Sequence, residues 1–178
     1  MEGIKQNCHT YGIKLIALAG SGLLYSCSIQ GQKPNILFII TDQQSAKMMS
    51  CAGNSYLKTP SMDRIAANGT RFELAYSPNP VSVPSRTSMM TGYFPSTFRF
   101  ETNQGGENAT ITDQVLANTL GKLLQKEGYE TVFGGKTHWA KGLNYTTCGF
   151  EKLTSDTYDG LAVSCAEYLR KEHGKPFF

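Results

Sequence analysis

Apolar runs along the chain predict short buried strands. Residues 35–41 form a continuous apolar run of strand length, rich in branched side chains, which is typical of a strand buried on both faces of a parallel sheet. Residues 70–76 and 129–133 predict two further strands, and residues 176–178 resemble the beginning of a fourth. These signals favour a layered protein with a mainly parallel sheet.

Helical patterns occupy the segments between these strands. Helices are predicted at about residues 60–69, 84–91, 114–127 and 159–173. The third is amphipathic, with Val115 and several leucines on one face and Gly128 as its stop. Alternating strands and helices predict an α/β fold in which helices flank the sheet. Three complete strands are fewer than the roughly five or six of an average sheet, so the domain is expected to be truncated.

The first 30 residues carry the pattern of an export leader. Lys5 and Lys14 precede an uncharged stretch from Leu15 to Tyr25, which small residues follow. This stretch is too short for a membrane-spanning helix, which needs about 20 apolar residues. A positive start, a short apolar middle and a small-residue exit predict a secretory signal over residues 1–30, with residues 31–178 as the folded part.

Cys27 offers a second outcome for the same leader. Leu24-Tyr25-Ser26-Cys27 resembles a bacterial lipoprotein box, in which the cysteine is lipidated and becomes the new N-terminus. Tyr25 is bulky at a position where such boxes usually hold a small residue, so plain signal cleavage stays an equal alternative. Either outcome predicts export by a bacterium, to the periplasm or to a membrane anchor through Cys27.

Composition and charge narrow the possible partners. Hydrophobic residues make up 40% of the chain and charged residues 17%, which favours a globular protein over a disordered one. The net charge of +3 is scattered without a basic run, so a nucleic-acid partner is not expected. Outside the leader, Cys51, Cys148 and Cys165 show no paired spacing, which predicts free thiols, with one disulfide as the alternative.

The segment Ser82-Val83-Pro84-Ser85-Arg86 combines features of an anion site. Pro84 suits the first turn of a helix, where its missing N–H needs no partner. Ser82 is then expected just before the helix, where free backbone N–H groups and the helix dipole favour an anion. Arg86, about one turn inside, offers a planar and permanently charged group to oxyanions. These residues alone would also fit an ordinary helix cap with a surface arginine.

Two other segments place polar groups after predicted strands. Asp42 directly follows the first strand, and open α/β sheets bind ligands at this edge. Lys136 and His138 follow the third strand, within Gly134-Gly135-Lys136-Thr137-His138. If the backbone is extended there, residues two apart point to the same side, so Lys136 and His138 would face one ligand together.

Taken in chain order, these three segments resemble the motifs of formylglycine-dependent sulfatases, a family of the alkaline phosphatase superfamily. Ser82-x-Pro84-Ser85-Arg86, followed by Thr91-Gly92, is similar to the signature at which the first residue is oxidised to formylglycine. Serine at that position resembles the subtype that a radical maturase modifies in anaerobic bacteria. The resemblance covers about residues 34–178, so it implies an alkaline-phosphatase-like fold for this part of the chain.

The resemblance also implies a role for each catalytic candidate. Ser82, once converted to formylglycine, would supply the hydrated aldehyde that attacks sulfur, which is covalent catalysis in two steps. Arg86 and Lys136 would neutralise sulfate oxygens. His138 would hold or deprotonate a hydroxyl of the hydrate.

A divalent cation is the cofactor that the resemblance implies. Asp42, Gln43 and the residue made from Ser82 would bind Ca²⁺ or another divalent cation through oxygen atoms. Most family members carry a second aspartate where this chain has Gln43. A neutral amide lowers the negative charge of the site and leaves the identity of the metal open.

The leading functional prediction is a sulfuric ester hydrolase that acts on a sulfated sugar or another small molecule. The alternatives are a phosphate or phosphonate ester hydrolase of the same superfamily, and an exported product without catalytic activity. Related enzymes are much longer and contribute further ligands. Residues 31–178 are therefore expected to be the N-terminal portion of the catalytic domain and to be inactive alone.

Overall fold

The computed structural model describes residues 33–156 and 158–178, so the predicted leader and Cys27 lie outside the described residues. The α-helices are α1 (Pro60–Asn68), α2 (Ser82–Thr91), α3 (Asp113–Leu116), α4 (Leu120–Lys126), α5 (Tyr145–Cys148) and α6 (Leu161–Arg170). The 3₁₀ helices are η1 (Ser50–Ala52), η2 (Pro95–Phe98) and η3 (Gly105–Asn108). Within the described ranges, no helix combines the length and the hydrophobicity that a bilayer crossing requires.

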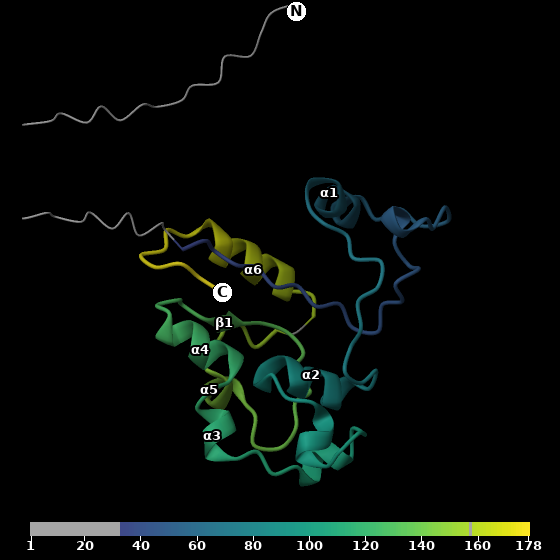
Figure 1. The fold of residues 1–178 in the computed structure, drawn as a ribbon. Coiled ribbons are helices and arrows are strands. Elements are labelled where there is room, and N and C mark those ends of the chain that lie inside the picture. The colour runs from purple at the N-terminus through teal and green to yellow at the C-terminus, as the bar shows by residue number, and fades with distance from the viewer. Residues whose placement is uncertain (1–32, 157) are drawn as a thin grey trace, which may run out of the picture. The chain divides into compact units, whose positions relative to one another are not determined.

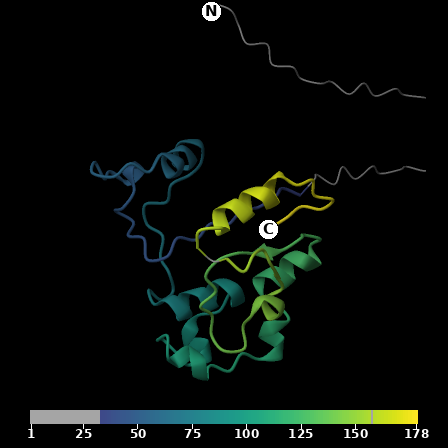
Figure 2. The ribbon, with the colours of Figure 1, turned by 180° about the vertical axis from the view of Figure 1, so that it is seen from behind.

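A small parallel sheet lies among these helices. Strand β1 (Val132–Phe133) pairs in parallel with β2 (Glu151–Lys152), and Val132 lies opposite Glu151. In Figure 1 and in the reversed view of Figure 2, β1 runs between α6 on one side and α4 with α5 on the other. Helices on both sides of parallel strands confirm the predicted α/β fold class.

The segment before the C-terminus extends this sheet beyond β1. Glu130 and Phe177 form a parallel bridge, in which the Phe178 N–H donates to the carbonyl oxygen of Glu130 at 2.8 Å. The Ile36 N–H donates to the carbonyl oxygen of Phe177, also at 2.8 Å. The beginning of a strand predicted at residues 176–178 is therefore confirmed.

Two of the predicted strands are wrong. Residues 35–41 form no strand, and Phe38 within them is 54% exposed. Residues 70–76 form no strand either, and Phe72 is 76% exposed. A strand needs a neighbouring backbone that pairs with it along its length. Among the described residues, the first segment has a single such bond, from Ile36 to Phe177, and the second has none. The apolar pattern alone therefore does not produce a strand.

The helix predicted over residues 114–127 is divided into α3 and α4. Thr119 interrupts it because its backbone is extended, at φ −69° and ψ 158°, where it caps α4. Its buried hydroxyl donates to the carbonyl oxygen of Thr147 at 3.0 Å. The amphipathic pattern runs through both helices, so it does not reveal this break. The break lets Thr119 bond α5. Val115, Leu116 and Leu120 still face the core, whereas Leu123 is 45% exposed.

Helix α2 forms the centre of the packing. Val83 near its start packs in one apolar cluster with Phe98, Phe100, Val115 and Ala140. Met90 near its end packs in a second cluster with Leu143, Cys148 and Phe150. Burial at both ends fixes the axial position and rotation of α2, and with them the side chains of its first turn.

The three cysteines of the described residues are free, as predicted. Cys148 is buried, and Cys51 and Cys165 are partly buried, without a disulfide among them. Burial raises the pKa of the Cys148 thiol to about 11. This thiol is therefore protonated and unreactive at neutral pH.

Candidate active site

Ser82 is the first residue of α2, one position inside the helix rather than just before it. Val81 is the N-cap residue and offers no side-chain hydrogen bond to the first turn. The cap comes instead from a distant residue: the Val83 N–H donates to Oδ1 of Asn103 at 2.9 Å. The helix start is thus held from another segment, and Ser82 is fixed beside this cap.

Loss of this cap is expected to weaken the protein without unfolding it. Asn103→Ala should lower the free energy of unfolding by about 1 kcal/mol, because the Val83 N–H loses its acceptor. Asn103→Asp, which keeps an acceptor oxygen, should stay close to the wild-type value. Chemical denaturation followed by circular dichroism measures both. Equal stability of the alanine variant and the wild type would show that solvent replaces the cap.

His138 meets Ser82 at the mouth of α2. Nδ1 of His138 lies 2.8 Å from Oγ of Ser82, across 56 positions of sequence. The segment that carries His138 is not extended as predicted. Gly135 has a φ of +92° and His138 a φ of +41°, both in the left-handed region. Left-handed backbone at these two positions, rather than an extended segment, therefore brings the imidazole to the serine.

Arg86 and Lys136 both bind Asp42. Nη2 of Arg86 lies 3.1 Å from Oδ1 of Asp42, and Nζ of Lys136 lies 2.9 Å from Oδ2. Nη1 of Arg86 also donates to the backbone oxygen of Lys136 at 3.0 Å. Arg86 is only 8% exposed, so it is not the surface arginine of an ordinary helix cap. Two cations against one carboxylate leave a local excess of positive charge, which favours an anion.

The Ser82–His138 contact and the ion pairs of Asp42 with Arg86 and Lys136 are carried by the same two parts of the chain, α2 and the segment after β1. Ser82 and Arg86 lie one turn apart on α2, and Lys136 and His138 lie two positions apart after β1. Thr87 joins these elements, because the Ala140 N–H donates to its buried hydroxyl at 3.3 Å. The structure thus brings together Asp42, Ser82, Arg86, Lys136 and His138. Gln43 is exposed next to Asp42 and has a φ of +57°.

The Lys136 ammonium, which donates a hydrogen bond to Asp42, holds the pKa of that carboxyl below its usual range. Partial desolvation acts in the opposite direction, and the Arg86 guanidinium lowers the pKa further. A lowered pKa in the folded state means that the contribution to stability is complete above the ordinary aspartate pKa of about 3.9. The contribution is lost as the pH falls below that value, through the lowered folded-state pKa.

Removal of the Lys136 charge tests whether this ammonium lowers the pKa of Asp42. In Lys136→Met the pKa of Asp42 is expected to rise toward its ordinary value, because the largest lowering interaction is gone. A carbon-detected NMR titration of the aspartate carboxyls measures it directly. Lys141→Met, which removes a lysine that does not contact Asp42, is the matched control. An unchanged Asp42 pKa in Lys136→Met would contradict the assignment.

The described residues do not form a cation site by themselves. Both carboxylate oxygens of Asp42 accept hydrogen bonds from Arg86 and Lys136. In the described part of the chain, no cluster of three or more His, Cys, Asp or Glu side chains could hold a metal ion. Because Ca²⁺ takes about 6–8 oxygen ligands, Asp42, Gln43 and Ser82 are too few to fit it on their own.

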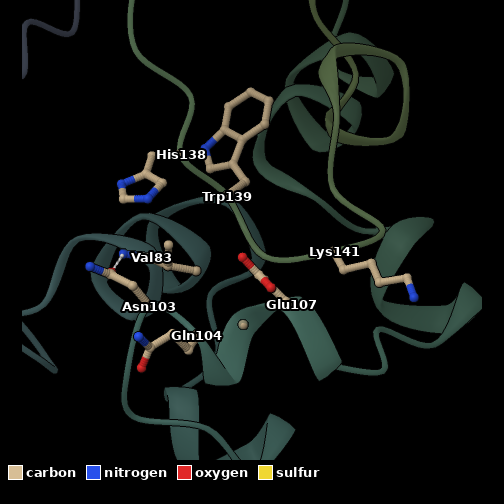
Figure 3. A pocket seen from close by; sticks show the side chains of 8 residues that line it. Val83, Asn103, Gln104, Glu107, His138, Trp139 and Lys141 are labelled. Atoms are coloured by element: carbon tan, nitrogen blue, oxygen red, sulfur yellow. Dashed lines mark hydrogen bonds between the residues drawn. The ribbon is translucent and has the colours of Figure 1, made fainter.

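A cleft of about 350 Å³ adjoins the Ser82–His138 pair. Figure 3 shows the residues that line it: Val83, Asn103, Gln104, Gly106, Glu107, His138, Trp139 and Lys141. Sequence reasoning missed Asn103 and Glu107 because they belong to no motif. Asn103 caps a helix that lies 20 positions away, and such a cap leaves no local pattern. The one hint of the cleft in the sequence is Trp139, a large aromatic residue that directly follows the candidate His138.

Comparison with known proteins identifies the family. The family model described as Sulfatase matches residues 34–172. An N-acetylglucosamine-6-O-sulfatase of Bacteroides thetaiotaomicron is 38% identical over 135 residues, which cover 76% of this chain and 23% of the relative. The uncharacterized sulfatase YidJ of Escherichia coli is 34% identical over 162 residues, which cover 80% of this chain and 31% of that protein.

A solved structure agrees with these relatives. BT4656 in complex with its substrate D-glucosamine-2-N,6-O-disulfate superposes with a TM-score of 0.63 and 30% sequence identity, over 82% of this chain and 33% of that one. The chain spans between about a fifth and a third of the length of the relatives described here. The family and fold predicted from the motifs are confirmed. The chain belongs to the sulfatase family.

Proposed function

We propose that the protein carrying this chain hydrolyses sulfate esters, with Ser82 as the precursor of its nucleophile. The contact that supports this most is the 2.8 Å approach of His138 Nδ1 to Ser82 Oγ at the start of a buried helix. Oxidation of Ser82 to an aldehyde removes two electrons and two protons and requires a maturase as oxidant. Hydration of the aldehyde would then supply an oxygen nucleophile at this position.

The neighbouring side chains would transfer the proton and stabilise the negative charge of the sulfate group. His138 lies within hydrogen-bond distance of the position from which the attacking oxygen starts, so it would move the proton of that oxygen. Arg86 and Lys136 would face the negative charge of the sulfate group. Asp42 holds both cations in place through its two oxygens. The buried guanidinium is positioned before any ligand arrives, which limits reorganisation during the reaction.

We propose a sulfated sugar as the substrate class and residues 31–178 as the N-terminal portion of the catalytic domain. The substrate proposal is supported by the relatives, one of which is named an N-acetylglucosamine-6-O-sulfatase and one of which was solved with a disulfated glucosamine. The domain proposal is supported by the family match over residues 34–172.

Two measurements test the chemistry. Mass spectrometry of the peptide that contains Ser82, after co-expression with a radical maturase, should show a loss of two hydrogens. The complete gene product should then hydrolyse 4-nitrophenyl sulfate much faster than 4-nitrophenyl phosphate. A faster reaction with the phosphate would support the alternative, a phosphate ester hydrolase of the same superfamily. An unmodified Ser82 together with no turnover of either ester would contradict the proposal.

We also propose that residues 1–30 direct export, with or without lipid attachment at Cys27. The pattern of charges and apolar residues in this segment supports it. Fractionation of bacterial cells that express the tagged gene product should find it outside the cytoplasm. Cys27→Ala should release it from membranes if Cys27 is lipidated, and should change nothing if the leader is simply cleaved.

A further inference from the structure

Asn79 uses both ends of its side-chain amide in the loop that leads into α2. Its Oδ1 accepts a hydrogen bond at 2.8 Å from the N–H of Val81, two positions further along the chain. Its Nδ2 donates to the carbonyl oxygen of Glu101 at 3.3 Å, across 22 positions of sequence. The side chain is partly buried. One residue therefore shapes the turn just before Ser82 and joins it to a distant segment.

The neighbours of Asn79 make this loop stiff. Pro78 and Pro80 each fix their own φ at about −65°, and each disfavours a helical backbone for the residue before it. The Ser77 hydroxyl donates to the carbonyl oxygen of Asn79 at 2.7 Å. The same hydroxyl lies 2.9 Å from Oγ of Ser85, in the first turns of α2. The loop is therefore bonded to the helix that it precedes.

Asn103 holds the other side of Ser82. Its Oδ1 accepts a hydrogen bond from the Val83 N–H at 2.9 Å, which Figure 3 shows as a dashed line. Asn79 and Asn103, here called the asparagine pair, thus bind the N–H groups of the residues immediately before and after Ser82. Asn103 also lies two positions after Glu101, whose carbonyl oxygen accepts from the Asn79 side chain. Both asparagines therefore depend on the same short segment of chain.

We infer that Asn79 is a positioning residue for the proposed reaction and that, together with Asn103, it fixes the backbone of residue 82 from both sides. The side chain of residue 82 has to stay within hydrogen-bond distance of His138, and Nδ1 of His138 lies 2.8 Å from Oγ of Ser82. A rotation of the backbone at residue 82 would carry this side chain away from the imidazole. Small misplacements of reacting groups slow a reaction strongly. The inference rests on the proposed function, because it assumes that residue 82 carries the nucleophile.

Loss of the Asn79 side chain should lower kcat and leave KM nearly unchanged. In the complete, matured gene product, Asn79→Ala should lower the kcat for 4-nitrophenyl sulfate by about tenfold. KM should stay within about twofold, because Arg86 and Lys136 are held by Asp42 and not by the asparagine pair. The kcat is divided by the fraction of residue 82 converted to formylglycine, which mass spectrometry measures, so that slower maturation is not mistaken for slower catalysis. An unchanged kcat per converted residue would overturn the inference.

A conservative variant and a matched control assign this effect to the acceptor oxygen of Asn79. In Asn79→Ser, the hydroxyl can accept from the N–H two positions further on, so kcat should return to within about threefold of the wild type. A serine variant as slow as the alanine variant would overturn the inference. Asn68→Ala also removes a side-chain amide, but Asn68 donates to the carbonyl oxygen of Arg64 within α1, at 2.7 Å. It should leave kcat within about twofold of the wild type. An equal loss of kcat in Asn68→Ala would also overturn the inference.

Amide hydrogen exchange distinguishes failure of this inference from failure of the proposed function. In the complete gene product, Asn79→Ala should speed the exchange of the Val81 amide by at least about threefold. The Val83 amide should also exchange faster, because Asn79 bonds the segment that carries Asn103. An unchanged Val83 amide would overturn the joint action of the asparagine pair, whatever the activity of the enzyme. Faster exchange at both amides, with no turnover of 4-nitrophenyl sulfate by the wild type, would overturn the proposed function and leave the pair as a purely structural cap of α2.

Discussion

Replacement of Ser82 by alanine is expected to lower the kcat for 4-nitrophenyl sulfate by at least about 10⁴-fold in the complete, matured gene product. The methyl group cannot be oxidised to an aldehyde, so no nucleophile forms beside His138. The KM should change much less, because Arg86 and Lys136 remain in place to bind the sulfate group. Steady-state kinetics measures both constants.

Ser88→Ala is the matched control for this variant. Ser88 lies on the same helix, and its buried hydroxyl has no hydrogen-bond partner among the described residues. Its loss should leave kcat within about twofold of the wild type. A Ser82→Ala variant that retains a tenth or more of the wild-type kcat would show that Ser82 does not supply the nucleophile.

Gly121→Ala is expected to have the largest effect on stability, lowering the free energy of unfolding by about 3 kcal/mol. A Cβ atom at this position of α4 would lie 2.5 Å from the carbonyl oxygen of Gly149 and also overlap that of Cys148. Both atoms belong to the backbone of α5 and its cap, so no side chain can rotate away. The melting temperature should fall by roughly 6–12 °C.

A second glycine provides the control for this effect. Gly174 has no heavy atom within 4 Å of the position that a Cβ would occupy. Gly174→Ala should therefore change the free energy of unfolding by less than about 0.5 kcal/mol. Thermal unfolding followed by circular dichroism compares the two variants. Equal melting temperatures for both would mean that α4 can move away from α5 at little cost.

The sequence predicted the structure and the site best at positions where one residue type is strongly preferred, either for its backbone conformation or for its chemistry. Gly128 was predicted to stop a helix, and its φ of +86° lies in the left-handed region, where glycine is favoured. The order of Asp42, Ser82 and Lys136 in three motifs predicted the family, because such motifs preserve chemistry rather than local geometry. The α/β class followed from the alternation of patterns.

The sequence was least informative where a partner far along the chain decides the structure. The apolar run at residues 35–41 predicted a buried strand, yet strand formation depends on pairing that a local pattern cannot show. Asn103 caps α2 from another segment, and Thr119 divides a continuous apolar face to reach α5. The left-handed backbone at Gly135 and His138 was also missed, because the prediction assumed an extended backbone there.

The contact between Asn35 and Phe177 has a consequence for the order of folding. These two residues are 142 positions apart, and the Phe177 N–H donates to Oδ1 of Asn35 at 3.1 Å. Closing so long a loop costs chain entropy that later contacts must offset, and such distant pairings slow folding. The neighbourhood of α2 and its local contacts can form first. The segment that delivers Asp42 to Arg86 would then dock late, so a nascent chain would bring these two charges together only after Phe177 has been synthesised.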